Sequence, residues 1–243
     1  MAAGGLRPLA GRRIVLTGAS RGIGRAAALR LARAGAQVLA VARDAQALTS
    51  LAFEAKPAAG RIFAHSCDLA SEEEIEALAD AAARRLGGVD ALVNNAGAGV
   101  FRELEALAPG EFEATLAVCL KAPFLLIRAL APYLEASGGE VVNVSSICAV
   151  TGFPGAAAYC AAKAGLEGMS RALAEELRPR GIRLSVLRPG ATATSMWKDI
   201  PGEFDTERMI PPDLVAESLE FLLSQSRRVW TETMVILPPA GRV

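Results

Sequence analysis

The segment Arg12–Gly24, RRIVLTGASRGIG, decides the fold class that this sequence predicts. Arg12 to Thr17 is a short apolar run, which is typical of a buried strand. It leads directly into a glycine-rich loop. An alanine-rich helix follows from about Arg25 to Ala34, with Gly35 as its expected C-cap. A strand, a glycine loop and a helix in this order predict the opening unit of an α/β domain.

The glycines of this loop, Gly18, Gly22 and Gly24, indicate a use for it. Glycine lets the backbone turn tightly, bring its N–H groups close to a pyrophosphate, and pack a helix closely against a strand. An ordinary strand-to-helix turn is the plain alternative. The position of the loop between a buried strand and a helix favours dinucleotide binding.

Strands and helices alternate along the rest of the chain. Further strands are expected at Gln37–Ala42, Arg61–Cys67 and Val89–Asn94, from Val141, and at Arg183–Leu187 and Thr233–Leu237. Helices are expected from Asp44 to about Ala55, from Ser71 to Leu86, at Glu111–Leu134, at Ala156–Arg178 and from Pro212 onward. The sequence therefore predicts a single Rossmann-like, doubly wound α/β domain over residues 1–243, with a parallel sheet of about seven strands and helices on both faces.

Charge and composition exclude several classes of function. Hydrophobic residues make up 52% of the chain and charged residues 21%, which is enough apolar surface for a large core. Lys+Arg and Asp+Glu are equal at 26 each, so no basic excess points to nucleic acid. Charged residues and prolines interrupt the apolar region Leu116–Leu134, so we expect no membrane span there. Met1–Arg13 lacks the apolar core of a signal peptide, and a cytoplasmic protein is expected.

The four cysteines, Cys67, Cys119, Cys148 and Cys160, show no paired metal-ligand spacing. They lie in or beside apolar segments, so we expect reduced, buried thiols and no metal site. The single histidine, His65, lies in a predicted strand far before the serines discussed next. A Ser-His-Asp hydrolase is therefore disfavoured.

A second segment, Val141–Lys163, carries the candidate chemistry: VVNVSSICAVTGFPGAAAYCAAK. Tyr159 and Lys163 are four residues apart, so on a helix they share one face, and Ser146 at the end of the preceding strand can reach that face. A free tyrosine has a pKa of about 10, and a nearby ammonium lowers that pKa. Tyr159 is therefore a candidate general acid/base. The alternative is a core tyrosine and a surface lysine near a serine pair.

The end of the second predicted strand bears on cofactor choice. Sites selective for NAD place an acid there to bind the ribose 2′-hydroxyl, whereas arginine suits a 2′-phosphate. Here the strand ends at Ala42 and Arg43, and Arg21 in the glycine loop supplies another cation. Two solvated surface arginines are the alternative. The pair favours NADP(H) over NAD(H).

Two later strand ends also carry polar residues. Asp68, followed by Leu69, ends the third predicted strand, and Asn94-Asn95-Ala96-Gly97 ends the fourth. Ligands of open α/β sheets bind at the carboxyl ends of the strands, so contacts with a ligand are expected here. Asparagine at a strand end can also simply form a turn.

Two predicted helices, Glu111–Leu134 and Ala156–Arg178, suggest self-association. The first is apolar nearly all round, so it must be covered on more than one side. The second carries Ala and Gly on several faces, which permits close packing. We expect a homodimer or homotetramer through these helices.

Taken together, these motifs resemble the short-chain dehydrogenase/reductase family over nearly the whole chain. The resemblance implies an NADP(H)-dependent oxidoreductase that transfers a hydride between nicotinamide and a small-molecule carbonyl or alcohol. It implies Ser146, Tyr159 and Lys163 as catalytic residues. It implies cofactor contacts from Gly18, Ser20, Arg21, Gly22, Ile23, Gly24, Arg43, Asp68, Leu69, Asn95, Gly97, Tyr159, Lys163, Thr192 and Thr194. A non-catalytic NADP-binding sensor that keeps the fold is the alternative.

The substrate side of the resemblance rests on the irregular segment at about 191–212. Its apolar residues and those after Ser146 suggest a pocket for a small or medium carbonyl compound. The candidate pocket residues are Ile147, Cys148, Phe153, Met196 and Trp197.

Two features depart from the family pattern. Cys119 stands where the family commonly has an asparagine that completes a proton relay. Pro123 lacks an N–H and so leaves the carbonyl of Cys119 without its usual helical partner, which favours a local kink. The chain also ends in Pro238-Pro239-Ala240 in place of a glycine-rich tail, which puts the C-terminal contribution to assembly in question.

Overall fold

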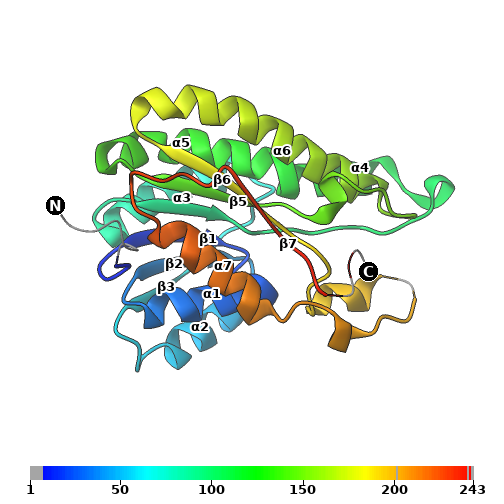
Figure 1. Ribbon diagram of the computed structural model, residues 1–243, viewed down its shortest axis with the longest axis horizontal. Helices are drawn as coiled ribbons and strands as arrows, with labels where there is room; N and C mark the ends of the chain where they lie inside the picture. The colour runs from blue at the N-terminus through cyan, green and yellow to red at the C-terminus, as the bar shows by residue number, and fades with distance from the viewer. Residues whose placement is uncertain (1–7, 201, 240, 242–243) are drawn as a thin grey trace.

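The computed structural model describes residues 8–200, 202–239 and 241. Its centre is a parallel sheet of seven strands in the order β3-β2-β1-β4-β5-β6-β7 (Figure 1). The strands are β1 (Arg13–Thr17), β2 (Gln37–Ala42), β3 (Arg61–Ser66), β4 (Ala91–Asn94), β5 (Glu140–Val144), β6 (Arg183–Pro189) and β7 (Thr233–Ile236). The α-helices are α1 (Gly22–Arg33), α2 (Ala45–Glu54), α3 (Glu72–Leu86), α4 (Pro109–Leu116), α5 (Ala122–Ser137), α6 (Ala157–Leu177) and α7 (Pro212–Ser224). The predicted fold class is confirmed.

The strand order places a switch point at β1. Val15 of β1 pairs with Leu39 of β2 on one side and with Leu92 of β4 on the other. The strands β2 and β3 are therefore added on one side of β1, and β4 to β7 are added on the other side. A crevice outside the carboxyl ends of the strands is expected at such a point. The glycine loop after β1 and the Asn94-Asn95 turn after β4 both lie at this edge.

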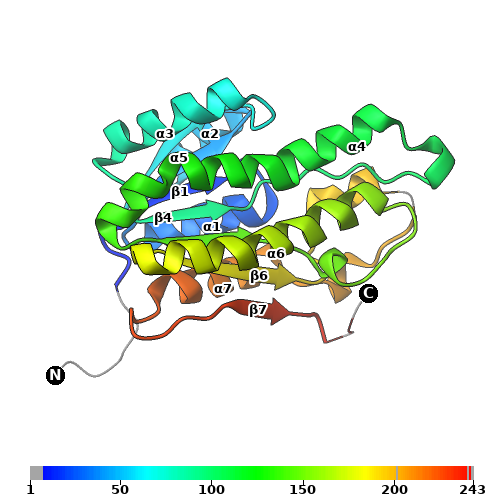
Figure 2. The same ribbon diagram turned by 90° about the horizontal axis from the view of Figure 1, so that it is seen from above.

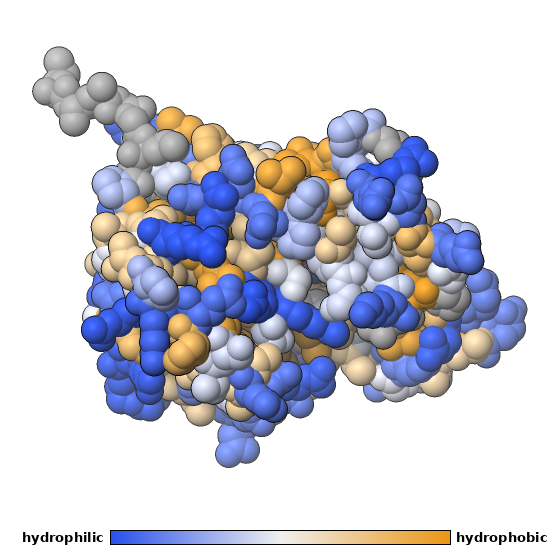
Figure 3. Space-filling model, turned by 90° about the horizontal axis from the view of Figure 1, so that it is seen from below, coloured by the Kyte–Doolittle hydropathy of each residue, from blue (hydrophilic) through white to orange (hydrophobic). Residues whose placement is uncertain are grey.

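Helices cover both faces of the sheet. α1, α2 and α7 lie on one face, and α3, α5 and α6 lie on the other (Figures 1 and 2). Two hydrophobic cores fill the layers, one around Leu31, Leu48 and Leu219, the other around Leu78 and Leu130. Most central strand residues are fully buried, as expected where both faces of a parallel sheet are covered. On the outer face of the α1, α2 and α7 layer, hydrophilic residues predominate and apolar ones form small, separate patches (Figure 3).

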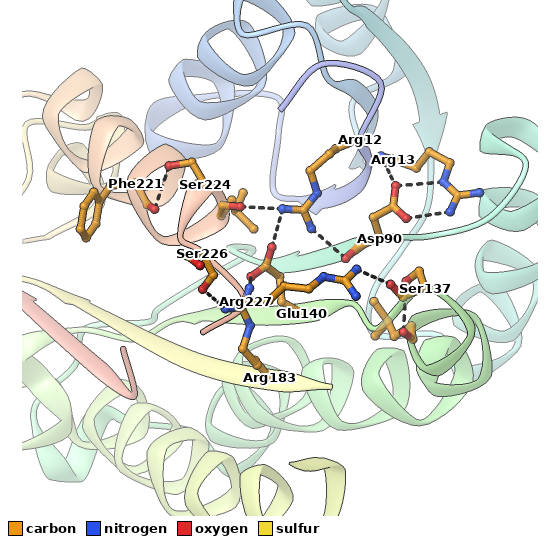
Figure 4. A network of polar contacts seen from close by, with 12 residues as sticks. Arg12, Arg13, Asp90, Ser137, Glu140, Arg183, Phe221, Ser224, Ser226 and Arg227 are labelled. Carbon is orange, nitrogen blue, oxygen red and sulfur yellow. Dashed lines mark hydrogen bonds and ion pairs between the residues drawn. The ribbon is translucent and has the colours of Figure 1, made fainter. Parts of the chain in front are cut away.

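An ionic network joins the amino ends of the strands, opposite the glycine loop (Figure 4). Glu140, which is 5% exposed, is paired with Arg12 at 2.5 Å and with Arg183 at 2.7 Å. Arg12 also donates to the carbonyl of Leu223, and Arg183 donates to the carbonyl of Val229. Glu140 and its two arginines therefore connect the starts of β1, β5 and β6 with α7 and with the segment between α7 and β7.

The predicted long helix is present but is built differently. α4, a π-helical turn (Ala117–Lys121) and α5 form one continuous helix, Pro109–Ser137, in which the Ala122 N–H donates to the Ala117 carbonyl. This helix is long enough and apolar enough (mean hydropathy 1.7) to cross a membrane, but half of its most apolar 18-residue stretch is buried within this fold. The core helix of a soluble protein can have the same length and composition.

The expectation that this helix is apolar nearly all round, and so must be covered on more than one side, is wrong. α5 has an exposed stripe that includes Phe124, Arg128 and Glu135, and Arg128 pairs with Glu76 at 3.8 Å. Its opposite side packs against α3 and the sheet of the same chain. The apolar sides of α5 are thus covered within one subunit, and the helix alone does not require a second copy.

Candidate active site

Ser146, Tyr159 and Lys163 converge at the carboxyl edge of the sheet. Ser146 follows β5, while Tyr159 and Lys163 lie on the first turns of α6, where they are 8% and 3% exposed. The Ser146 side chain lies close enough to Tyr159 to lower the pKa of that phenol. Lys163 Nζ donates to the Val144 carbonyl at 2.8 Å and lies 5.6 Å from the centre of the Tyr159 ring. The structure thus brings together the three residues that the sequence selected.

Burial dominates the electrostatics of this cluster. It raises the pKa of Tyr159, nearby Cys119 and Cys148 raise it further, and the Ser146 side chain lowers it. Burial also lowers the pKa of Lys163. The expected lowering of the Tyr159 pKa by Lys163 is therefore not what this site shows, because removal from water disfavours the charged form of both groups.

The glycine loop has the geometry of a backbone cradle. Gly18 (φ +68°) and Gly22 (φ +56°) adopt left-handed conformations, which glycine tolerates best. A Cβ on Gly24 would lie 2.1 Å from the Gly18 carbonyl oxygen. The Ala19 N–H donates to the Val41 carbonyl at 3.1 Å, which fixes the loop against the end of β2. A side chain is thus excluded at Gly24, in the first turn of α1.

Asn95 holds this loop in place. Its Nδ2 donates to the Thr17 carbonyl at 2.9 Å and to the Gly18 carbonyl at 3.3 Å, and its backbone N–H donates to Thr17 Oγ1. The Asn95 side chain is therefore committed to the β1 end. Gly97 lies close to the Lys163 ammonium, since a Cβ there would be 3.9 Å from Nζ.

The remaining predicted cofactor residues lie on the same edge. Arg21 and Arg43 are exposed, at the start of α1 and just after β2. Asp68 accepts a hydrogen bond from the Ala70 N–H at 3.0 Å, and its own N–H donates to Glu74. Ser20 is half-buried, Leu69 is buried, and Ile23 packs against the core around α1.

The segment after β6 returns to the glycine loop. A Cβ on Gly22 would lie 3.2 Å from the methyl group of Thr194, so these two residues are neighbours. Thr192 Oγ1 donates to the Gly190 carbonyl, and Trp197 Nε1 donates to the Thr192 carbonyl at 2.7 Å. The centres of the Trp197 and Phe204 rings lie 4.6 Å apart. Trp197 therefore braces its own segment; Pro201 of this segment and Ala240 of the C-terminal motif lie outside the described residues.

The predicted pocket residues differ in exposure. Ile147 is 6% exposed, while Cys148, Phe153 and Met196 are half-buried. Burial raises the pKa of Cys148 to about 11. Phe101, which the sequence reasoning missed, stands 5.9 Å from Tyr159, ring centre to ring centre. Its only signal was a lone aromatic residue shortly after the Asn-Asn-Ala-Gly turn.

Cys119 occupies the π-helical turn beside this site. It is fully buried, and it packs in one cluster with Tyr159 and Ala162. The expected irregularity of the helix at this position is present as the π turn.

Comparison with known proteins places these features in a family. The pattern of the family described as short chain dehydrogenase matches residues 12–203 of the chain. D-threitol dehydrogenase of Mycolicibacterium smegmatis is 34% identical over 228 residues, covering 90% of this chain and 88% of that protein. The 3-oxoacyl-(acyl-carrier-protein) reductase of Thermotoga maritima is 32% identical, over 89% of this chain and 92% of that protein.

Solved structures resemble the chain over nearly its full length. A metagenomic short-chain oxidoreductase in complex with NADP matches with a TM-score of 0.84 and 37% identity, covering 95% of this chain and 98% of that one. A short chain dehydrogenase from Burkholderia cenocepacia in complex with NADP matches with a TM-score of 0.88 and 30% identity, over 97% and 99%. The protein therefore belongs to the short-chain dehydrogenase/reductase family of oxidoreductases.

Proposed function

We propose that this protein is an NADP(H)-dependent oxidoreductase that transfers a hydride between nicotinamide and a carbonyl or alcohol substrate, with Ser146, Tyr159 and Lys163 as its catalytic residues. The observation that carries this proposal is the convergence of the three side chains at one edge of the sheet, with the buried Lys163 ammonium beside the buried Tyr159 ring. Tyr159 is the proton donor of the site, and Ser146 orients the oxygen that receives the proton.

The glycine cradle fits a dinucleotide. No side chain fits at Gly24, and the backbone N–H groups at the start of α1 face the sheet edge at the positive end of a helix. We assign the pyrophosphate to this loop, the adenine side to Asp68 and Leu69, and the nicotinamide side to Thr192, Thr194 and Lys163. Bound NADPH supplies the hydride, and the protein supplies position, charge and the proton.

The raised pKa of Tyr159 suits this role. A phenol whose pKa lies above its ordinary value is fully protonated at neutral pH. It holds a proton ready for a carbonyl oxygen that gains negative charge as hydride arrives. Ser146 limits this rise of the Tyr159 pKa.

NADP(H) is our proposed cofactor in preference to NAD(H). Arg21 and Arg43 are both exposed at the edge where β2 ends, and Ala42 provides no carboxylate for a ribose 2′-hydroxyl. Arginine binds phosphate through charge-assisted hydrogen bonds. Two structurally similar relatives were solved in complex with NADP, which supports the same choice.

For the substrate we propose a small or medium carbonyl compound with an apolar body. Ile147, Cys148, Phe153, Met196 and Trp197, with Phe101 beside Tyr159, offer apolar surface. Exposed alanines along α6 (Ala157, Ala161 and Ala164), with Phe124 (40% exposed) on α5, support our proposal of a homodimer or homotetramer. We also propose that the protein is cytoplasmic. Light scattering at micromolar concentration tests the assembly, and a monomer would contradict it.

The experiment that tests the function follows NADPH oxidation by absorbance with a panel of aldehydes and ketones. We expect turnover with at least one carbonyl compound, and turnover slower by about 10²–10⁴-fold when Tyr159 is replaced by Phe. Tight NADPH binding with no turnover across the panel would favour the non-catalytic sensor instead.

A further inference from the structure

A buried ion pair lies next to the proposed catalytic residues and is not explained by the chemistry above. Glu167 on α6 is 4% exposed, and Arg188 on β6 donates to it twice, from Nε at 2.8 Å and from Nη2 at 2.5 Å. The Ser145 hydroxyl donates a third hydrogen bond to Glu167 Oε1, at 2.7 Å. A buried carboxylate is costly unless it is paired and hydrogen-bonded, and these three donors meet that need.

The position of Glu167 connects it to the site. It lies four residues after Lys163 and eight after Tyr159, so all three occupy one face of α6. Its partner Ser145 directly precedes Ser146 and donates its backbone N–H to the Leu187 carbonyl at 2.7 Å. Glu167 thus joins α6, the end of β5 and the end of β6.

We propose that Glu167 is a positioning residue for the active site, which ties the segment carrying Ser146 to β6 and supplies the negative charge that keeps Lys163 an ammonium ion. This inference rests on the proposed function, since it assigns Glu167 to the same Ser-Tyr-Lys chemistry. Arg188 is the cation that holds the Glu167 carboxylate in its orientation.

The groups around Lys163 determine in which direction its pKa changes when Glu167 is neutralised. Burial lowers the pKa of Lys163, whereas Cys119 from the π turn, Cys148 after β5 and Glu167 on the same helix raise it. Tyr159, the other titratable group beside it, stays neutral at pH 7 because burial raises its pKa. Glu167 is the carboxylate among these groups, and it is itself faced by the cations Arg188 and Arg171. Removal of the Glu167 charge therefore destabilises the Lys163 ammonium.

Two variants that break the same ion pair separate this role from a structural one. Glu167→Gln removes the negative charge and leaves Arg188, so Lys163 loses its proton more easily. The alkaline limb of the pH–activity profile, where deprotonation of Lys163 is expected to end activity, should therefore move about one pH unit lower. Arg188→Gln leaves the carboxylate beside Lys163, so the alkaline limb is expected to stay in place or move higher. A role limited to packing predicts the same direction, or no shift, in both variants.

Two further variants complete the design. Ser145→Ala removes the tether and keeps the charge, so we expect kcat to fall about tenfold with the alkaline limb unchanged. Glu175→Gln, on the same helix, removes an exposed carboxylate paired with Arg178, and neither kcat nor the pH profile is expected to change. A limb shift in Glu175→Gln as large as that in Glu167→Gln would overturn the proposal.

A readout that does not depend on turnover separates this proposal from the proposed function. The titration of the Lys163 side chain is followed by NMR in the full chain, free and with NADP⁺. A lower Lys163 midpoint in Glu167→Gln but not in Arg188→Gln supports the charge role even if no carbonyl compound is reduced. Equal midpoints in wild type and both variants would overturn it, whether or not the wild type is active.

Discussion

The thiol of Cys119 donates a hydrogen bond to the backbone carbonyl of Ala98, with 3.2 Å between sulfur and oxygen. This bond connects the π turn of the long helix to the loop after β4, next to Gly97 and thus to Lys163. Cys119 stands where the family resemblance led us to expect an asparagine, and its thiol, a smaller donor, makes this local contact. The side chain is thereby tied to the protein backbone.

We predict that Cys119→Asn changes kcat by less than about tenfold, or 1.4 kcal/mol. The π turn and Pro123, which has no N–H to donate, set the backbone here whichever side chain is present. Steady-state kinetics with NADPH and a carbonyl compound that the enzyme reduces measure the effect. Cys67→Ser, a substitution at another cysteine, is the control. A hundredfold gain in the Asn variant would show a proton relay interrupted by the natural cysteine.

Tyr159→Phe is expected to lower kcat by about 10²–10⁴-fold while leaving the affinity for NADPH nearly unchanged. Phenylalanine keeps the ring, and with it the contact with Phe101, and removes only the transferable proton. Fluorescence titration of NADPH provides the binding control. Retention of most of the wild-type kcat would exclude Tyr159 as the acid.

Arg43→Ala is expected to lower kcat/KM for NADPH at least tenfold and to leave kcat/KM for NADH nearly unchanged. A charge-assisted bond to a phosphate contributes about 1.5–3 kcal/mol. Arg61→Ala is the matched control, because Arg61 is also exposed but begins β3 at the opposite edge of the sheet. Equal losses with both cofactors would contradict a 2′-phosphate site.

Glu140→Gln is expected to lower the free energy of unfolding by about 3–5 kcal/mol, because Arg12 and Arg183 are left around a neutral amide. Urea denaturation at pH 7 measures this loss. Glu175→Gln, which breaks an exposed pair with Arg178, is expected to cost no more than about 1 kcal/mol. Similar losses in the two variants would show that the network at the amino ends adds little.

Acid stability should depend on Asp90. Burial raises the pKa of Asp90, but the hydrogen bonds and charge of Arg13 lower it by more, so the net pKa is lowered. The resulting stabilisation is complete above the ordinary carboxyl pKa of about 3.9 and is lost as the pH falls through the lower folded value. Asp90→Asn is expected to flatten this acid loss in urea unfolding curves measured across the pH series. An unchanged dependence of stability on pH in Asp90→Asn would argue against the Arg13–Asp90 ion pair as its source.

Patterns local in sequence predicted much of this molecule. Apolar runs located each strand of the described residues, and Asp44 and Ser71, where two helices were expected to begin, are the N-caps of α2 and α3. The Tyr159–Lys163 spacing sufficed to place both side chains on one helix face. Properties set by distant parts of the chain were not predictable in this way. The covering of α5 depends on α3, and Glu74 reaches the Asp68 N–H where a capping box would have it reach Ser71.

The site shows the same division. Its residue types follow from spacing, but the pKa of Tyr159 depends on burial beneath residues far away in sequence, and the sequence carries no measure of burial. Phe101 approaches Tyr159 only because the loop after β4 lies against the start of α6. The Glu167–Arg188 pair likewise requires α6 and β6 to be packed together.

The Glu140 network also bears on how the chain is made. Arg12 and Glu140 leave the ribosome well before Arg183 and the Val229 carbonyl that it binds. Until Arg183 has been synthesised, Glu140 can pair with Arg12 but not with its second arginine partner. The stabilisation that the carboxylate at the start of β5 provides therefore becomes complete only when segments made early and late in synthesis have come together.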